Sequence, residues 1–447
     1  MRIIADLQIH SKYSRACSQD LNPKSIGQWA DKKGIQVIGT GDFTHPKWLA
    51  ELKDSLEEAK PGLYKLRDGS SRALFMITGE VSSIYKQGDK VRRVHNMILV
   101  PNFRAADGII KGLEKVGANL RADGRPIMGV HCDDLVKIVK DASASTEVIP
   151  AHAWTPHFGV FGSLSGFNTV EEAFGDQAKH IFAIETGLSS DPKMNWQISG
   201  LDKYSLVSNS DAHSLRKIGR EANVFEINGD KLSYAEIIRI VKLKNPAEFL
   251  FTIEFFPEEG KYHLDGHRDC KFSCLPEQTK KLKGVCPVCG KKLLVGVLNR
   301  VDELADREHG FTPASAIPFK SVIPLEEIIA ETLGVGTQSK KVVEMYEKMV
   351  NSSRPPLLKG GGEMQSPPLS LKRGEGELCD EFSILLDLSE EEIVNISSTA
   401  IAQAVIRVRQ GKVELQGGYD GVFGKIQIFS EQEREKLMLK PKQMGLF

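Results

Sequence analysis

Histidine and carboxylate side chains recur along the first half of the chain, close to the ends of short apolar segments. Imidazole nitrogens and carboxylate oxygens are ligands that zinc, iron and manganese accept in proteins. If the apolar segments are strands of one sheet, their carboxyl ends bring these side chains to a common mouth. The residues at such positions are His10, Asp42, His45, Glu80, His95, His152, Glu185, Asp211 and His213.

The apolar segments alternate with helical or irregular stretches, which predicts a parallel sheet or a (β/α) barrel. One intervening helix is expected over residues 25–34, with Ser25 as its N-cap and Gly34 as its stop. The ligand-type residues at strand ends favour the barrel. The expected strands are residues 3–9, 37–40, 75–79, 96–101, 127–130, 148–150, 181–184 and 206–208.

A second group of metal-binding residue types lies between positions 267 and 289. Two residues separate Cys286 from Cys289, and a glycine follows, a spacing typical of a tetrahedral zinc site. The other half is open, because Cys270 can be joined by His267 or by Cys274. The chain has seven cysteines, an odd number, which in a reducing compartment favours metal binding over disulfides. Four protein ligands leave no open position, so this zinc is expected to be structural.

The charge of the chain is balanced as a whole and unbalanced locally. Lys and Arg total 59, and so do Asp and Glu. Residues 261–300, which contain the cysteines, hold nine basic residues and three acidic ones. A partner such as nucleic acid would therefore meet a local basic surface and no overall positive field.

We expect three parts along the chain. Residues 1–230 form the barrel, and residues 231–300 a connecting strand (249–254) with the zinc-binding module. Residues 301–447 form a mainly helical C-terminal region, with helices near 324–333 and 390–407 and a Gly-rich turn beside a strand at 417–426. A Pro-, Gly- and Ser-rich stretch at 352–377 is expected to be a flexible insertion.

Taken together, the barrel motifs resemble the PHP (polymerase and histidinol phosphatase) family. They are Gln8-Ile-His10, Gly41-Asp-Phe-Thr-His45, Gly79-Glu80, His95, Ala151-His152 and Ser210-Asp-Ala-His213. The resemblance implies a distorted (β/α)7 barrel that holds two or three divalent metals (Zn, Mn, Mg or Fe) and hydrolyses phosphate esters. The implied metal ligands are Gln8, His10, Asp42, His45, Glu80, His95, His152, Asp211 and His213, of which Glu80, Asp211, His213 and His152 are assigned to catalysis.

Gln8 departs from the family pattern, which has a histidine at this position. An amide oxygen is a neutral and weaker ligand than an imidazole nitrogen. One metal is therefore expected to bind weakly or to differ in identity. A barrel that binds DNA without hydrolysing it stays an alternative.

A second resemblance spans nearly the whole chain and is to the endonuclease Q family of DNA-repair enzymes. It is carried by residues 39–48, 185–192, 266–268, 301–307 and 421–424. It implies metal-dependent cleavage of DNA 5′ to a deaminated base (deoxyuridine, deoxyinosine, deoxyxanthosine) or an abasic site. A replication or repair protein is left open as a further partner.

Flipping a lesion from the duplex needs a wedge or a pocket and cations for the backbone. The candidates near the ligand-bearing loops are Phe43, Trp48, Trp154, Phe158 and Phe161, with Lys47, Arg216 and Arg220 for phosphates.

A small-molecule phosphatase is the other alternative, because a barrel alone does not define a substrate. The sequence starts in a strand pattern without a signal peptide and contains no apolar run long enough for a membrane span. We therefore expect a cytoplasmic protein with no membrane partner.

Overall fold

The computed structural model describes residues 1–353, 378–430 and 432–434, so the insertion predicted at 352–377 lies almost entirely outside the described residues. The chain divides into two compact units, Met1–Lys320 with Gly417–Gly424, and Ser321–Gln416 with Lys425–Phe447. The predicted parts 1–230 and 231–300 both fall in the first unit, together with residues 301–320. The three-part division stays a prediction. Among the described helices, none is long and apolar enough to cross a membrane.

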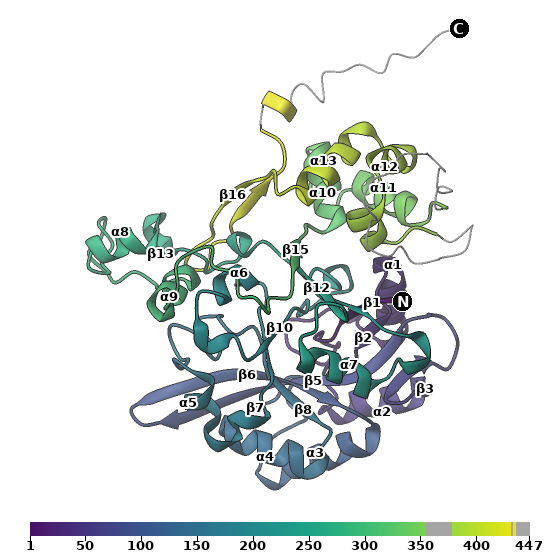
Figure 1. Ribbon diagram of the computed structural model, residues 1–447, viewed down its shortest axis with the longest axis vertical. Helices are drawn as coiled ribbons and strands as arrows, with labels where there is room; N and C mark the ends of the chain where they lie inside the picture. Colours follow the sequence, from purple (N-terminus) through teal and green to yellow (C-terminus); the bar gives the residue numbers. More distant parts are fainter. Residues whose placement is uncertain (354–377, 431, 435–447) are drawn as a thin grey trace. The chain divides into compact units, whose positions relative to one another are not determined.

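The first unit is built on a large sheet (Figure 1). Its strands are β1 (Arg2–Asp6), β2 (Val37–Gly39), β3 (Leu56–Lys60), β4 (Leu63–Leu66), β5 (Leu74–Gln87), β6 (Lys90–Val100), β7 (Ile127–Met128), β8 (Glu147–Pro150), β11 (Ala222–Glu226), β12 (Phe249–Glu254) and β15 (Phe319–Ser321). In the described part of the chain they pair in the order β15–β12–β11–β1–β2–β5–β4–β3, with β6 and β7 on β5 and β8 on β6. A parallel pair, β9 (Ala183–Glu185) and β10 (Ser205–Val207), packs beside β8.

The strand pairing is mixed, which corrects the expectation of a parallel sheet. β1, β2 and β5 pair in parallel, but β5 and β6 form an antiparallel hairpin and β11 runs antiparallel to β1. The hairpin arises because only Gly88 and Asp89 separate β5 from β6, too short a link for a crossover helix. The coarser prediction of a mixed α/β fold is confirmed.

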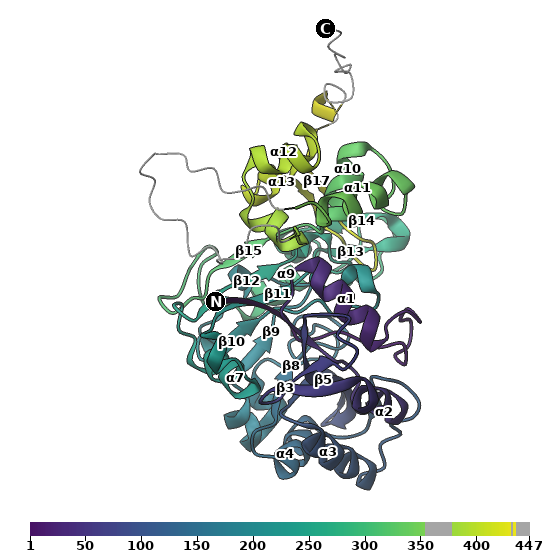
Figure 2. The ribbon, with the colours of Figure 1, turned by 90° about the vertical axis from the view of Figure 1, so that its right-hand side faces the viewer.

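Against strands of this sheet lie the helices α1 (Pro23–Lys33), α2 (Pro46–Ser55), α3 (Phe103–Lys115) and α4 (Cys132–Ala142) of the first unit. Further helices follow them along the chain, among them α5 (Val170–Phe174), α6 (Pro192–Asn195) and α7 (Tyr234–Leu243). Figures 1 and 2 both show α3 and α4 side by side. Asn22, and not the predicted Ser25, caps α1, because its side chain accepts the Ser25 N–H. Gly34 ends the helix at φ +82°, as predicted.

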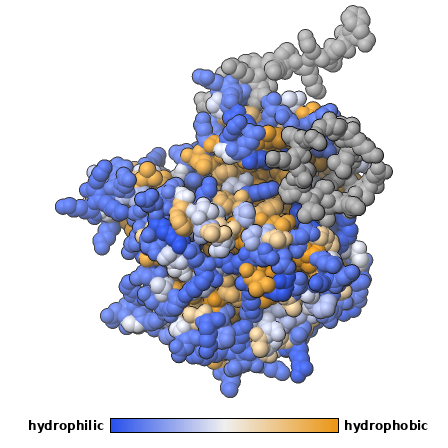
Figure 3. Space-filling view, viewed as in Figure 1, coloured by the Kyte–Doolittle hydropathy of each residue, from blue (hydrophilic) through white to orange (hydrophobic). Residues whose placement is uncertain are grey.

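Residues 261–300 form a small cysteine module within the first unit. It contains β13 (Asp265–His267), β14 (Phe272–Cys274), α8 (Pro276–Lys281) and the first part of α9 (Val297–Leu304). The module surface around α8 is mainly hydrophilic (Figure 3). The predicted Gly-rich turn packs on it, since Leu264 N–H donates to Gly418 O at 2.8 Å and Gly421 N–H donates to Lys261 O at 3.0 Å.

Arg300 of α9 joins the cysteine module to the loop of residues 153–168 that follows β8. Its Nε donates to Phe161 O at 3.1 Å, and its Nη2 donates to Phe167 O at 3.0 Å and Asn168 Oδ1 at 2.7 Å. Arg300 is therefore the one buried member of the basic residues counted at 261–300.

The second unit is mainly helical in its described part. Its helices are α10 (Leu325–Leu333), α11 (Lys340–Val350), α12 (Glu390–Ile396) and α13 (Thr399–Arg409), and β16 (Glu414–Gln416) pairs with β17 (Lys425–Gln427). The single helix predicted at 390–407 is two helices, because Ser398 caps a new helix start by accepting the Ile401 N–H. Glu381 ties α10 to α11 by accepting from Leu325 N–H and Tyr346 Oη.

We predict that Arg300→Ala destabilises the first unit. The substitution removes the three hydrogen bonds to the loop and the ion pair to Glu303, and it leaves two carbonyl oxygens unpaired, a loss of about 3 kcal/mol. Thermal melting and limited proteolysis at residues 153–168 measure it. Lys292→Ala, which changes an exposed residue of the same module, is the control. Equal melting temperatures and cleavage rates for the two variants would contradict this stabilising role of Arg300, which we call the Arg300 clamp.

Candidate metal centre

The centre of the site is Glu80, a carboxylate with 1% exposure in the middle of β5. Its two oxygens face different histidines. Oε1 contacts His95 Nδ1, and Oε2 lies 3.1 Å from His10 Nε2. The sequence predicted that Glu80 follows the end of its strand. It lies inside the strand instead, because β5 continues to Gln87. One carboxylate thus joins two groups of imidazoles.

The first group contains Glu80, His95 and His152. His95 Nδ1 lies 3.1 Å from His152 Nε2, which is 3.5 Å from Glu80 Oε1. Arg125 Nη1 lies 3.6 Å from the same oxygen. His95 lies inside β6 opposite Ser82, and not before the strand as predicted, because the β5–β6 hairpin is long. Phe158 stacks on the His95 ring at 4.4 Å.

The second group contains His10, Asp211 and His213. His10 Nε2 lies 3.0 Å from Asp211 Oδ1, and His213 Nδ1 lies 3.8 Å from the same oxygen. The His10 and His213 rings are 4.6 Å apart. In each group one ligand atom per residue lies within 4.8 Å of the others, a spacing that could hold a metal ion.

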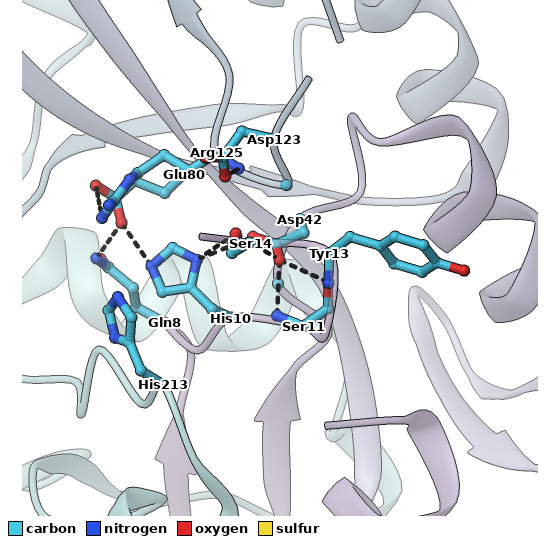
Figure 4. A network of polar contacts seen from close by, with 12 residues as sticks. Gln8, His10, Ser11, Tyr13, Ser14, Asp42, Glu80, Asp123, Arg125 and His213 are labelled. Atoms are coloured by element: carbon cyan, nitrogen blue, oxygen red, sulfur yellow. Dashed lines mark hydrogen bonds and ion pairs between the residues drawn. The ribbon is translucent and has the colours of Figure 1, made fainter. Parts of the chain in front are cut away.

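Asp42 holds His10 from the side opposite Glu80 (Figure 4). Asp42 Oδ1 is 2.9 Å from His10 Nδ1, and Oδ2 accepts from Ser11 N–H, Ser11 Oγ and Ser14 Oγ at 2.6 to 2.9 Å. A carboxylate on the second ring nitrogen fixes the tautomer and orientation of a ligating histidine. Asp42 therefore positions His10 and lies outside both groups.

Three of these residues sit in the left-handed region of backbone conformation. The φ angles are +49° at Asp42, +31° at His152 and +47° at Asp211. Each residue follows a strand end, β2, β8 or β10. Such conformations cost about 1–3 kcal/mol for residues other than glycine and persist where surrounding contacts enforce them. Contacts with the rest of the protein must therefore keep these loops in a backbone conformation that is locally unfavourable.

Buried carboxylates and amides supply that restraint. Asp6 accepts from Ser210 N–H at 3.0 Å and Gly219 N–H at 2.9 Å, on either side of Asp211. Glu185 accepts from His152 N–H at 2.7 Å, and its other oxygen accepts from Asn209 Nδ2 at 2.8 Å. Burial raises the pKa of Asp6 to about 6 and that of Glu185 to about 8.

The electrostatics of the two groups are set by their mutual charges. Burial alone would raise the pKa of Glu80, but its contacts with His95 and Arg125 hold this pKa well below its usual range. Burial lowers the pKa of His95 to about 4, which favours the neutral imidazole that binds metals. The pKa of Asp211 is likewise low despite burial, because of His10.

The donor set fits divalent cations. In both groups imidazole nitrogens and carboxylate oxygens converge, and the Oε1 of Gln8 and Nδ1 of His152 are buried without a hydrogen-bond partner among the described residues. Gln8 Nε2 donates to Glu80 Oε2 at 3.1 Å, so the amide oxygen is the atom left for a ligand. Lone pairs of the converging ring nitrogens repel one another, and a bound cation would turn these contacts into favourable ones.

The structure brings together most of the ligands expected from the sequence. Asp42 and His45 lie outside both groups, because Asp42 contacts His10 from behind, whereas His45 precedes α2 and stacks on Tyr13 at 4.4 Å. Arg125 and the serines around Asp42 were not expected. The spacing Ser11-x-x-Ser14 directly after His10 could have indicated the serines. Arg125 lies in an irregular loop without a sequence pattern that would have indicated it.

The predicted wedge residues are mostly core residues. Phe43, Trp48, Trp154 and Phe161 are at most 1% exposed. Trp48 Nε1 donates to Gly41 O at 2.8 Å and Trp154 Nε1 to Asn195 Oδ1 at 2.8 Å, so these rings support the ligand loops. Arg220 also has an internal role, since its Nε donates to Ser210 O at 2.8 Å. Lys47 is exposed and Arg216 is half-buried.

The cysteine module brings four ligand-type residues together. His267, Cys270, Cys286 and Cys289 each offer an atom within 4.8 Å of the others, and His267 Nδ1 is 3.6 Å from Cys289 Sγ. Cys274 lies outside this group and contacts Thr279 Oγ1 at 3.2 Å. Of the two alternatives left open by spacing, the structure favours His267 over Cys274. This cluster could bind zinc.

Known proteins resemble this chain over nearly its full length. The sequence matches no protein-family model. It is 25% identical over 438 residues to the uncharacterized protein YqxK of Bacillus subtilis, an alignment that covers 95% of this chain and 99% of the relative.

Two solved structures share the fold. One is the lesion-specific endonuclease PfuEndoQ from Pyrococcus furiosus, with a TM-score of 0.79 and 27% identity over 99% of this chain and 98% of the other. The second is endonuclease Q in complex with a 27-mer duplex substrate that has an abasic lesion at the active site. Its TM-score is 0.79, with 28% identity over 97% of this chain and 98% of that chain.

We predict that Cys286→Ala abolishes metal binding by the cysteine module, whereas Cys274→Ala retains it. Cys286 lies in the four-residue group and Cys274 does not. Elemental analysis of the purified chains after dialysis measures the metal content. The fold of the sheet is expected to survive both changes, because the module lies outside the main sheet. Equal loss of metal in the two variants would assign Cys274 to the site and contradict the geometry.

Proposed function

This chain belongs to the endonuclease Q family, and we propose that it is a metal-dependent endonuclease that cuts a DNA strand at lesions. The substrates are DNA with a deaminated base (deoxyuridine, deoxyinosine, deoxyxanthosine) or an abasic site, and the bond cut is the phosphodiester 5′ to the lesion. A relative whose active site holds an abasic lesion supports this substrate class.

The observation that carries the proposal is the position of Glu80 between two groups of ligands. Its Oε1 faces His95 and His152, and its Oε2 faces His10, which in turn contacts Asp211. A carboxylate placed in this way would hold divalent metals together with the ligands of both groups. When bound, such metals acidify a water molecule and neutralise charge on the attacking and leaving oxygens of a phosphodiester.

The residues of the chain have distinct tasks in this proposal. Glu80, His95, His152, His10, Asp211 and His213 hold the metals, with Gln8 as a weaker ligand through its amide oxygen. Asp42 keeps His10 oriented. Arg125 has a side chain that is 25% exposed beside Glu80, so its guanidinium can reach a phosphate oxygen of the DNA.

The rest of the chain is assigned as follows. The strand path from β11 through β1, β2, β5, β6 and β8 to β9 and β10 forms the distorted (β/α)7 barrel, a closure supported by the Ile9–Ala212 bridge. The cysteine module holds one structural zinc ion. The helical C-terminal region contributes to DNA binding.

We predict metal-dependent nicking of duplex DNA that carries uracil, hypoxanthine, xanthine or an abasic site. Gel assays with Mn²⁺ or Mg²⁺ measure it, and EDTA should stop it. Glu80→Gln should lower the rate by at least about 100-fold, because the bridge between the groups is lost. His45→Gln, a change outside both groups, should cost less than about 10-fold. The absence of nicking on every lesion would overturn the proposed function.

Gln8 favours a second candidate, a DNA-binding protein in which hydrolysis is weakened. We expect Gln8→His to lower the metal concentration for half-maximal nicking by about 10-fold or more, because an imidazole replaces an amide oxygen. Gln8→Leu, which removes the ligand atom, is the matched control and should raise that concentration. Unchanged metal content and nicking in both variants would make Gln8 a spectator.

A further inference from the structure

Phe423 is a large aromatic side chain on the surface of the first unit, and it is 64% exposed. Single exposed apolar residues are common and carry no meaning alone. Phe423 differs from such residues in how rigidly its turn is held and in the charges that surround it.

The turn that carries Phe423, Gly417–Gly424, is fixed by its backbone to residues 258–264, at the start of the cysteine module and just before it. Gly418 N–H donates to Glu258 O at 2.8 Å, and Gly424 N–H donates to Glu259 O at 3.0 Å. Tyr419 and Val422 exchange two hydrogen bonds of 3.0 and 2.7 Å across the turn. A Cβ on Gly418 would lie 2.4 Å from Gly260 O, so glycine is required for this close approach. Little conformational entropy is therefore left to lose when the Phe423 ring is bound.

Two cations accompany the ring. Lys261 Nζ lies 4.4 Å from the Phe423 ring centroid. Arg268 is exposed, and its Nη1 is 3.4 Å from the position a Cβ on Gly421 would take. The nearby Asp420 carboxylate accepts a hydrogen bond from the backbone N–H of Arg268 at 2.6 Å. An exposed aromatic ring beside a lysine, on a turn that also contacts an arginine, matches what single-stranded or unstacked nucleic acid needs, a stacking face and backbone cations.

A short path of packed backbone connects this turn to the metal centre within the same unit. A Cβ on Gly260, the residue before Lys261, would lie 3.2 Å from Leu188 O. A Cβ on Gly187, the residue before Leu188, would lie 2.5 Å from His152 Cβ. His152 belongs to the Glu80 group. The residues that hold the turn therefore pack against residues 187–188, which in turn pack against the metal-site residue His152.

We propose that Phe423 stacks on a base of the DNA that is unstacked near the lesion, while Lys261 and Arg268 contact the neighbouring phosphates. The inference rests on the proposed function and assigns to the substrate a contact outside the metal centre. Stacking on an aromatic side chain is insensitive to sequence, so it suits an enzyme whose lesions occur in any context.

The test compares Phe423→Ala with Phe423→Trp and with the control Phe311→Ala. Phe311 is also exposed, at 43%, and lies 4.3 Å from the Arg307 guanidinium. Nicking of an abasic duplex should fall by about 10-fold in kcat/KM for Phe423→Ala, mainly through KM, and be kept by Phe423→Trp and Phe311→Ala. Metal content and melting temperature should be unchanged in all three.

A second readout does not depend on cleavage. With EDTA present, 2-aminopurine placed next to the abasic site should change its fluorescence when the wild-type chain binds, and less with Phe423→Ala. Wild-type nicking that Phe423→Ala leaves intact would overturn the stacking role and keep the proposed function. A Phe423-dependent fluorescence change without any nicking would do the reverse. A change of oligomeric state in Phe423→Ala, with equal DNA binding, would assign the ring to a second copy and overturn the proposal.

Discussion

The structure of the site depends on the burial of one carboxylate among imidazoles. A carboxylate with 1% exposure is tolerated only when positive charge or hydrogen-bond donors surround it, and Glu80 has His10, His95, His152, Arg125 and the amide of Gln8. Because Glu80 is buried, each of these groups must stay close to its carboxylate. Divalent cations satisfy the same requirement more fully, because they pair with the carboxylate and the imidazole nitrogens together.

This arrangement is held by unfavourable local backbone. Asp42, His152 and Asp211 have positive φ, and Asp6 and Glu185 bind the N–H groups at or beside two of them. Aspartate and histidine tolerate this conformation better than most residues. The free energy of the folded sheet thus maintains a geometry that the isolated loops would not adopt, and it keeps the ligands in place before metal or substrate binds.

The sequence predicted which residues form the site better than it predicted their positions in the strands. The ends of β1, β2, β8 and β10 were recognisable from apolar segments, so His10, Asp42, His152 and Asp211 were placed near a common mouth. Glu80 and His95 were misplaced at strand ends because the length of the β5–β6 hairpin depends on pairing between segments, which periodicity does not encode.

Contacts between distant segments were also beyond the sequence. Arg300 was counted as a surface charge, yet it is buried against residues 161–168, and the turn at 417–424 packs on a module about 150 residues earlier in the chain. The choice of His267 over Cys274 needed the antiparallel pairing of β13 and β14, which puts Cys274 opposite Asp265, where its thiol contacts Thr279.

The Arg300 clamp has a consequence for how this protein can be divided. The loop at 153–168 begins one residue after His152 and carries Phe158 against His95, but part of its hydrogen bonding comes from α9. A fragment that ended near residue 230 would contain every residue of both ligand groups and still lack the guanidinium that binds this loop. The candidate metal ligands and the residues that support them are thus interleaved along the chain, and the metal centre with its support is not confined to one continuous segment.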